Sequence, residues 1–240
     1  MKILAFDTST TVAAVAVCED DKLLGEYILN HEKKHSEKLL PLTNALFKDL
    51  GLSPDEFDIY AASTGPGSFT GLRIGIATVK SMAYAAEKPV AGVPTLDVLS
   101  FNAAAYDGLI CPMLDARNNQ VYTALYKAEK GRISNITEYM GVEVGSIVEK
   151  VKELGQRAVF VGEAAVMHRE LISQALGEAA EFLPGNLNLP RASSVAHLAY
   201  LQWEEGKLQN CYDLVPFYLR KSQAERELER KKQEAQDLGG

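Results

Sequence analysis

The first fifty residues alternate between short apolar runs and polar turns, and then show an apolar stripe with helical spacing. Residues 2–7 and 12–18 are rich in Val, Ile and Ala and flank the turn TSTT, which predicts two strands joined by a tight turn. A third strand, KLLGEYILN, follows the acidic turn EDD. We expect a helix next, with Ser36 as its N-cap and Gly51 at its end. Its apolar stripe consists of Leu39, Leu42, Leu46 and Leu50.

Two further strands and two further helices follow. The apolar run DIYAAST predicts a strand that enters the turn GPGSFTG, and the residues after this turn have helical character as far as Ala86. The short run PVAGV predicts another strand, and the segment from Thr95 to about Ala105 another helix. The first part of the chain therefore has the element order βββαβα.

The same element order begins again at residue 109. When Asp7 is aligned with Asp115, an apolar strand, an aspartate at its end, a polar turn and a second apolar strand coincide. The second strand lies in QVYTALY, and a third is expected in RISNITEYM. The later run AVFVGEAA predicts a buried strand that enters a glycine loop and a helix near residues 166–176. The sequence thus predicts an α/β protein with a duplicated βββαβα unit.

A duplicated unit of this kind resembles the two-lobed fold shared by actin, hexokinase and the heat-shock-chaperone ATPases (the ASKHA fold). The resemblance implies two lobes around a nucleotide cleft and a last helix that returns from the second lobe to the first. Residues 193–206 are the candidate for that helix. We expect an N-terminal lobe at residues 1–106, a C-terminal lobe at 107–218, and a charged tail, helical or disordered, at 219–240.

Composition narrows the functional classes. The net charge of -7, from 25 basic and 32 acidic residues, argues against a chain that grips nucleic acid by itself, so a role with RNA would need a basic partner. The three cysteines are far apart and never form a C-x-x-C pair, which is typical of reduced thiols in a cytoplasmic protein. No signal peptide or membrane span is expected, because no apolar run is long enough.

The stretch NHEKKH contains the H-E-x-x-H pattern of zinc proteases, formed by His31, Glu32 and His35. That chemistry requires both histidines on one face of a helix and a third ligand elsewhere. The helix signal starts only at Ser36, and Lys33 and Lys34 would oppose binding of a Zn²⁺ ion. We therefore interpret this stretch as a polar connection.

The turn GPGSFTG is the best candidate for an anion site. Gly65 and Gly67 join a strand to a helix and would expose backbone N–H groups at the helix N-terminus, where a phosphate is favoured, although a purely structural turn is the commoner meaning. Asp7 in the first lobe and Gly162 in the second complete a set for weak nucleotide binding. Asp7 is also explained as a strand-end residue that satisfies its turn.

The helix after this turn is apolar or small on nearly every face, so it must be covered on two sides. Gly71 and Gly75 lie one turn apart, a spacing that lets another helix approach the backbone closely. A fully buried core helix is the alternative explanation.

Several motifs together resemble the TsaB family of the bacterial tRNA threonylcarbamoyladenosine synthase complex. They are DTST, HSEKLLP, STGPGSFTGLRIG, GVPTLDVL and the late PFYLRKSQAE, and the match runs from about residue 2 to 226. The resemblance implies a non-catalytic scaffold subunit required for threonylcarbamoyl transfer to N6 of the adenosine next to the anticodon, in tRNAs reading codons that begin with A.

The resemblance also implies the partners. They are a TsaD-like catalytic paralogue, a TsaE-like P-loop ATPase, and a second copy of the chain when it is alone; tRNA is met only through the complex. TsaD carries paired histidines after the segment that reads VAGV here, whereas this chain has VPTLDVL and no histidine between residues 36 and 167. No catalytic residue and no metal site is therefore expected on this chain, and ATP, Mg²⁺ and the catalytic metal are expected on the partner subunits.

The family's contact helices correspond to residues 36–50 and 69–86 here. The partner-binding residues implied for the first helix and its start are His35, Ser36, Leu39, Leu42, Thr43 and Leu46. Those of the second helix are Phe69, Gly71, Leu72, Arg73, Gly75, Ile76, Val79, Lys80, Met82, Ala83 and Tyr84. The alternative functions are an ATP-dependent small-molecule kinase of the same fold and a zinc glycoprotease, and the label glycoprotease has been used for this family.

Overall fold

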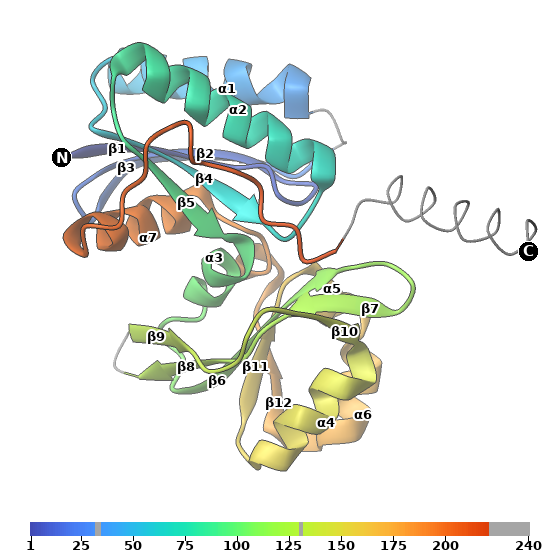
Figure 1. The fold of residues 1–240 in the computed structure, drawn as a ribbon. Coiled ribbons are helices and arrows are strands. Elements are labelled where there is room, and N and C mark those ends of the chain that lie inside the picture. The colour runs from blue at the N-terminus through green and yellow to red at the C-terminus, as the bar shows by residue number, and fades with distance from the viewer. Residues whose placement is uncertain (32–34, 130–131, 221–240) are drawn as a thin grey trace, which may run out of the picture.

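The computed structural model describes residues 1–31, 35–129 and 132–220, which form two lobes stacked one above the other (Figure 1). Predictions on Glu32 and on residues 221–240 of the tail lie outside the described residues. Within these ranges, no helix combines the length and the hydrophobicity that a membrane span needs.

The first lobe is a five-stranded sheet covered by helices on both faces (Figure 1). Its strand order is β3-β2-β1-β4-β5; β1, β2 and β3 are antiparallel, and β4 and β5 run parallel to β1. Its elements are β1 (Lys2–Asp7), β2 (Ala13–Glu19), β3 (Lys22–Leu29), α1 (His35–Leu50), β4 (Ile59–Gly65), α2 (Phe69–Ala86), β5 (Val90–Pro94) and α3 (Thr95–Phe101).

The second lobe repeats this arrangement. Its main strand order is β10-β7-β6-β11-β12, which corresponds strand by strand to the first sheet, and β8 and β9 extend it along β6. Its elements are β6 (Gly108–Asp115), β7 (Gln120–Thr123), β8 (Tyr126–Glu129), β9 (Arg132–Asn135), β10 (Met140–Glu143), α4 (Val144–Leu154), β11 (Ala158–Val161), α5 (Glu163–Met167), α6 (Arg169–Leu176), β12 (Ala180–Phe182) and α7 (Ala192–Glu204). The matching orders confirm the predicted duplication.

The apolar patterns of the helices explain which sheet face each covers. Leu39 and Leu46 of α1 and Val79 of α2 are buried with Leu4 and Val15 on one face of the first sheet. On the other face lies α7, whose buried residues pack against Ile3 and Ala5. Helices therefore cover both faces of the first sheet, which is largely buried.

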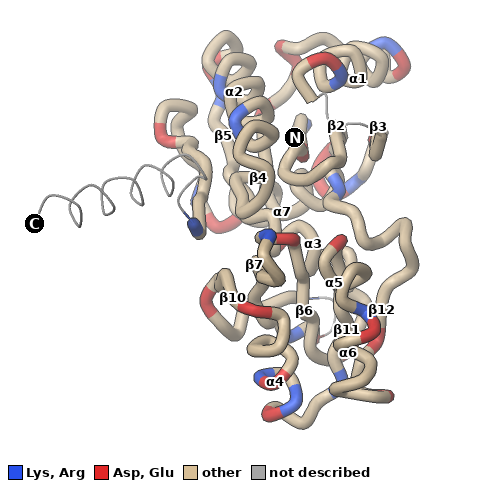
Figure 2. The backbone as a smooth tube through the Cα atoms, turned by 90° about the vertical axis from the view of Figure 1, so that its right-hand side faces the viewer, with Lys and Arg blue, Asp and Glu red and all other residues tan. Residues whose placement is uncertain are grey.

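Helices α3 and α7 cross between the lobes. Leu96 and Leu99 of α3 pack with Ile110 and Leu114 of β6, so this first-lobe helix belongs to a second-lobe core. Conversely, α7 follows the second-lobe strand β12 and packs on the first sheet. Figure 2 shows both helices at the level where the lobes meet.

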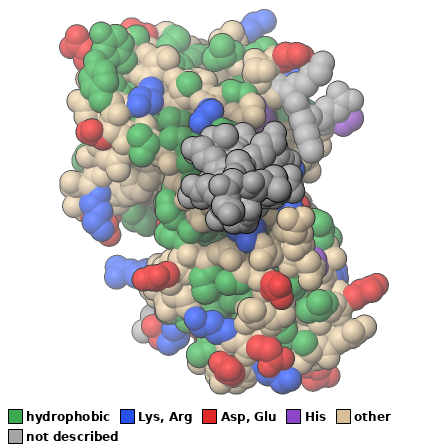
Figure 3. Space-filling model, turned by 45° about the vertical axis from the view of Figure 1, so that its right-hand side comes forward, with side chains coloured by type: hydrophobic (Ala, Val, Ile, Leu, Met, Phe, Trp, Pro, Cys, Tyr) green, Lys and Arg blue, Asp and Glu red, His purple; other side chains and the backbone are tan. Residues whose placement is uncertain are grey.

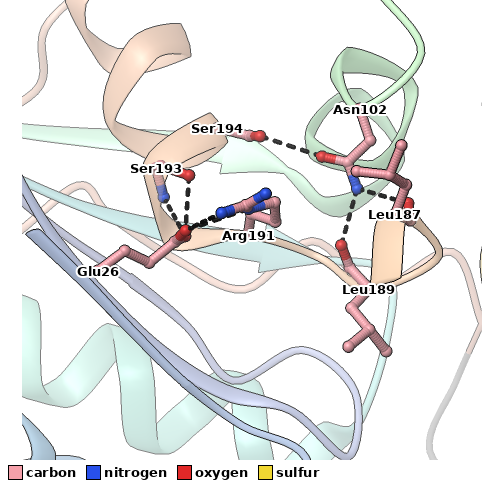
Figure 4. Close-up of polar contacts among 7 residues, drawn as sticks. All are labelled: Glu26, Asn102, Leu187, Leu189, Arg191, Ser193 and Ser194. Carbon is pink, nitrogen blue, oxygen red and sulfur yellow. Dashed lines mark hydrogen bonds and ion pairs between the residues drawn. The ribbon is translucent and has the colours of Figure 1, made fainter. Parts of the chain in front are cut away.

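A buried carboxylate fixes the start of α7 (Figure 4). Glu26 of β3, whose side chain is 5% exposed, accepts hydrogen bonds from the Arg191 guanidinium, from the Ser193 backbone N–H at 2.9 Å and from the Ser193 hydroxyl at 2.8 Å. A negative charge at a helix N-terminus also interacts favourably with the helix dipole. Asn102, just after α3, donates to the carbonyls of Leu187 and Leu189 and so ties the two chain crossings together.

Some predicted boundaries are wrong. The first helix begins at His35, so Ser36 stands inside its first turn and does not cap it. The helix that starts at Thr95 ends at Phe101, because residues 102–105 form turns. The helix expected at 166–176 is two helices, α5 and α6, which meet at His168.

The second and third strands of the second lobe are each divided. Residues 120–126 contain β7 and the start of β8, because the long strand β6 pairs with β7 through residues 113–115 and with β8 through residues 108–110. Similarly, the stretch RISNITEYM forms β9 and the first residue of β10. The division follows from β6, a long strand that pairs with two segments at once. The sequences of the short strands do not indicate that pairing.

Candidate functional site

Asp7 lies at the carboxyl end of β1, and both of its side-chain oxygens are engaged within the chain. Oδ1 accepts from the Ser9 backbone N–H at 2.9 Å and from the Ser9 hydroxyl at 2.8 Å, and Oδ2 accepts from the Ser63 hydroxyl. The side chain is fully buried, and this burial raises the pKa of Asp7 above the ordinary carboxyl value. Asp7 thus closes the β1–β2 turn and ties it to β4.

Gly71 and Gly75 of α2 pack directly against this turn. A Cβ atom on Gly71 would lie 2.0 Å from the Thr8 carbonyl oxygen, and a Cβ on Gly75 would lie 2.5 Å from Thr8 Oγ1. The Thr8 hydroxyl donates to the Gly71 carbonyl at 2.7 Å. The prediction that these glycines admit another helix is therefore wrong, since the β1–β2 turn of the same lobe occupies that space.

The predicted phosphate turn is also filled from within. The Ser68 backbone N–H, at the N-cap of α2, donates to the Ser9 carbonyl at 2.6 Å, and the Ser68 side chain accepts from the Gly71 N–H. A Cβ on Gly67 would lie 2.2 Å from the Ser9 carbonyl oxygen, and one on Gly65 would lie 2.4 Å from the Phe217 carbonyl oxygen. Both glycines thus make room for backbone of this chain.

Gly162 of the second lobe also makes room for backbone of this chain. Its backbone has a φ of 108°, and its N–H donates to Asn188 Oδ1 at 3.0 Å. A Cβ there would lie 2.3 Å from the Met113 carbonyl oxygen. The four residues predicted for weak nucleotide binding therefore each have a structural role in turns or close packing.

The histidines of the H-E-x-x-H pattern do not share a helix. His31 lies in a bend before α1, whereas His35 is the first residue of α1. His35 is buried, with Nε2 2.9 Å from the Thr10 carbonyl oxygen, so it anchors the β1–β2 turn. The described residues contain no group of three or more His, Cys, Asp or Glu side chains placed to hold a metal ion.

The predicted partner helices α1 and α2 lie side by side on the outer face of the first sheet (Figure 1). Of the 17 predicted contact residues, ten are buried in their own lobe and support the surface from beneath: His35, Leu39, Thr43, Leu46, Gly71, Leu72, Gly75, Ile76, Val79 and Ala83. The seven accessible ones are Ser36, Leu42, Phe69, Arg73, Lys80, Met82 and Tyr84. Figure 2 shows Lys and Arg positions along the backbone of α2, and Figure 3 shows hydrophobic side chains gathered on the first lobe above a narrowing between the lobes.

Sequence reasoning missed a partly buried polar cluster between the lobes. Asp97 of α3 accepts hydrogen bonds on Oδ1 from the hydroxyls of Tyr126, at 2.6 Å, and Tyr139, at 2.8 Å, both from the second lobe. Burial raises the pKa of Asp97, and it raises the pKa of both tyrosines. The lone aspartate in an apolar helix, in GVPTLDVL, was the only signal in the sequence that could have indicated this cluster.

Comparisons with known proteins agree with this architecture. The family model described as TsaD: tRNA N6-adenosine threonylcarbamoyltransferase matches residues 22–228. The tRNA threonylcarbamoyladenosine biosynthesis protein TsaB of Bacillus subtilis (strain 168) is 33% identical over 225 residues, which are 94% of this chain and 96% of that protein. The protein of the same name from Escherichia coli (strain K12) is 30% identical over 231 residues, with 95% and 98% covered.

Solved structures give the same result for the fold. A Pseudomonas aeruginosa structure described as an uncharacterized protein with similarity to peptidase YEAZ has a TM-score of 0.78 and 25% identity, and covers 91% of this chain and 99% of its own. A ROK hexokinase from Thermus thermophilus has a TM-score of 0.53 at 13% identity, covering 86% of this chain and 100% of its own. The second likeness concerns the fold alone, and it confirms the two-lobed ASKHA prediction.

Proposed function

The chain belongs to the TsaB family of tRNA threonylcarbamoyladenosine biosynthesis proteins, within the wider family that the TsaD model describes, and on that premise we propose that it is a non-catalytic partner subunit. In this proposal it supports transfer of a threonylcarbamoyl group to N6 of the adenosine next to the anticodon, in tRNAs reading codons that begin with A. The transfer itself takes place on a TsaD-like paralogue.

One observation carries this proposal: the chain's own atoms occupy the positions where a nucleotide phosphate would meet the first lobe. The Thr8 and Ser9 carbonyls lie against Gly71 and Gly67, and the Ser68 N–H at the start of α2 already has an acceptor. Backbone N–H groups that are already paired have little to offer an anion. This arrangement favours a supporting role over phosphoryl transfer by this chain.

The accessible face of α1 and α2 is the proposed docking surface. Tyr84 is 63% exposed, and Arg73, which is also exposed, lies on the same helix; Lys80 is half-buried and holds the Tyr212 and Leu214 carbonyls of this chain. Aromatic residues and arginine are the side chains that most often dominate the energy of protein interfaces. We expect a TsaD-like protein to occupy this face, or a second copy of the chain when it is alone.

The remaining partners follow from the same proposal. A TsaE-like P-loop ATPase joins the assembly, ATP, Mg²⁺ and the catalytic metal belong to the partner subunits, and tRNA is contacted through the complex, since the net charge of this chain is -7. We place the complex in the cytoplasm, because all three cysteines are free and buried, as is typical of a reducing compartment.

A matched pair of substitutions tests the docking surface. Tyr84→Glu puts a charge on α2, whereas Met167→Glu puts one on α5 of the second lobe, and both native side chains are 63% exposed. We expect Tyr84→Glu to weaken binding to the TsaD-like protein by a factor of about 30 or more, the scale of an interface hot spot. Titration calorimetry with the two purified proteins measures this. Equal affinities for the two variants would contradict the proposed surface.

A further inference from the structure

The segment from Lys207 to Arg220, here called the strap, leaves α7 and runs along the first lobe before it reaches the second lobe (Figure 1). Its first part is tied to β5, because Gln209 and Val90 exchange two backbone hydrogen bonds of 2.9 Å each. Cys211 and Leu214 are buried in the core beneath α2. This end of the strap is a fixed part of the first lobe.

The same segment is held by the outer side of α2. The Lys80 ammonium donates to the Tyr212 carbonyl at 3.2 Å and to the Leu214 carbonyl at 3.0 Å. Arg73 donates through Nε to the Tyr218 hydroxyl at 3.2 Å. The Tyr218 ring in turn stacks on Phe69, with centroids 4.7 Å apart. Basic and aromatic side chains of α2 therefore bind the strap from Tyr212 to Tyr218.

Beyond these anchors the strap passes from the first lobe to the second. The Phe217 N–H donates to the Thr64 carbonyl at the end of β4 at 2.7 Å, while the Phe217 ring meets the ring of Tyr139 from the second lobe edge-on, with centroids 5.5 Å apart. Arg220 then donates to the Ala116 carbonyl at 3.4 Å and to the side chain of Gln120, across the β6–β7 turn. Phe217 and Arg220 thus join the first lobe to the second.

The two ends of the strap differ in how firmly they are held. The first-lobe end has a buried leucine, a buried cysteine and a strand-like pairing, whereas Phe217 and Arg220 are only half-buried. A pocket of about 250 Å³ remains between the lobes under the strap, lined among others by Thr64, Tyr139 and Phe217. Loosely packed contacts next to open space cost less to break than a close-packed core does.

We propose that the strap is a latch that holds the two lobes in one relative orientation. The covalent connections between the lobes, at residues 102–107 and 183–191, are tied to each other by Asn102 and therefore act as one hinge region. The strap adds a separate, non-covalent link at Phe217 and Arg220. Release at these two residues leaves the Asp97 hydrogen bonds to Tyr126 and Tyr139 as a remaining polar link between the lobes. It therefore widens the range of lobe orientations about the hinge while the rest of the strap stays on α2.

The latch also lies within the face that the proposed function assigns to a partner. Tyr212 and Val215 of the strap are 67% and 63% exposed beside α2. If the proposed function holds, a partner on α2 also touches the strap. The latch itself is a property of the isolated chain, so it can be tested without any partner.

Distances between spin labels on the two lobes test the latch. Lys48→Cys on α1 and Glu153→Cys on α4 provide exposed labelling sites, and the native thiols are buried, so the unsubstituted chain should take up no label. Labelled chain diluted into an excess of unlabelled chain, so that only distances within one chain are measured, should give one narrow distance distribution. Adding Phe217→Ala with Arg220→Gln should broaden it and produce a second population of distances.

Tyr212→Ala is the matched control, because Tyr212 is an aromatic strap residue whose ring contacts Tyr84 of the first lobe. We expect this variant to retain the narrow distribution. A narrow distribution in the double variant as well would overturn the latch.

A milder variant keeps the test decisive if the double variant does not fold. Arg220→Gln alone retains the Phe217 ring, and it should speed hydrogen exchange at residues 116–120 of the β6–β7 turn relative to Tyr212→Ala. Unchanged exchange there, together with an unchanged distance distribution, would contradict the proposal. Neither outcome involves a partner, so failure of the latch is distinguishable from failure of the proposed function.

Discussion

At the scale of single residues, Gly71 and Gly75 show how far the sequence alone predicts packing. Their spacing correctly indicates that something approaches the backbone of α2 closely, because a Cβ on either glycine would lie within 2.5 Å of a Thr8 atom. The spacing does not say which segment approaches. The occupant is the β1–β2 turn, more than fifty residues earlier in the sequence, and no local pattern encodes that contact.

Replacing Gly71 by alanine tests this packing. The new methyl group would meet the Thr8 carbonyl at 2.0 Å, and neither backbone can give way freely. We expect Gly71→Ala to lower the free energy of unfolding by about 3 kcal/mol or more, as overpacking against backbone does. Gly145→Ala in α4 is the control, since a Cβ there meets nothing within 4 Å and should stabilise by about 0.5–1 kcal/mol. Urea denaturation measures both, and equal midpoints would refute the close approach.

The buried carboxyl of Asp7 makes stability depend on pH. Burial raises its pKa in the folded state, so the folded protein binds this proton more tightly than the unfolded chain does. The contribution of Asp7 to the free energy of unfolding therefore falls as the pH rises through a window. This window runs from the ordinary pKa of aspartate, about 3.9, to the raised pKa of Asp7 in the folded state. Relative to Asp7→Asn, which does not titrate, the wild-type chain should gain stability as the pH is lowered through this window. A difference between the two proteins that does not vary with pH would exclude the raised pKa.

At the scale of elements, the regular patterns of the first lobe predicted its strands and helices well. The stripe of Leu39, Leu42, Leu46 and Leu50 faces the core as expected, and α2 ends at Ala86 as expected. The second lobe was predicted less well, because β7 to β10 are four residues each and take their order from pairing partners. Strands that short contain too few alternations for the period to determine their ends.

The link between β3 and α7 is a prediction at this scale. Glu26→Gln removes the charge that receives Arg191 and the N-terminus of α7, and we expect a loss of about 2 kcal/mol in the free energy of unfolding, typical of hydrogen bonds to a buried charged group. Glu205→Gln is the control, because its pairing with Lys207 is exposed and should contribute less than about 1 kcal/mol. Similar losses in the two variants, measured by chemical denaturation, would show that Glu26 does not fix α7.

At the scale of the whole molecule, the duplicated element order and the fold that it resembles predicted two lobes built from the same unit. It did not predict how the lobes are joined. Asp97 with its two tyrosines and the strap from Lys207 to Arg220 link distant parts of the chain, and the strap residues show no strand or helix period. The conformation of such segments depends on the surfaces on which they pack. Their own residues do not describe those surfaces, so the local sequence does not predict the conformation.

The central claim is that this chain supports chemistry on another chain. The most direct test is threonylcarbamoyl transfer to tRNA, reconstituted from the purified TsaD-like protein, the P-loop ATPase, ATP and threonylcarbamoyl-adenylate as the activated donor, with and without this chain. The account predicts modification only when this chain is present, no modification by the chain alone, and poor rescue by Tyr84→Glu compared with Met167→Glu. Equal modification in its absence, or ATP turnover by the isolated chain at rates typical of kinases, would contradict it.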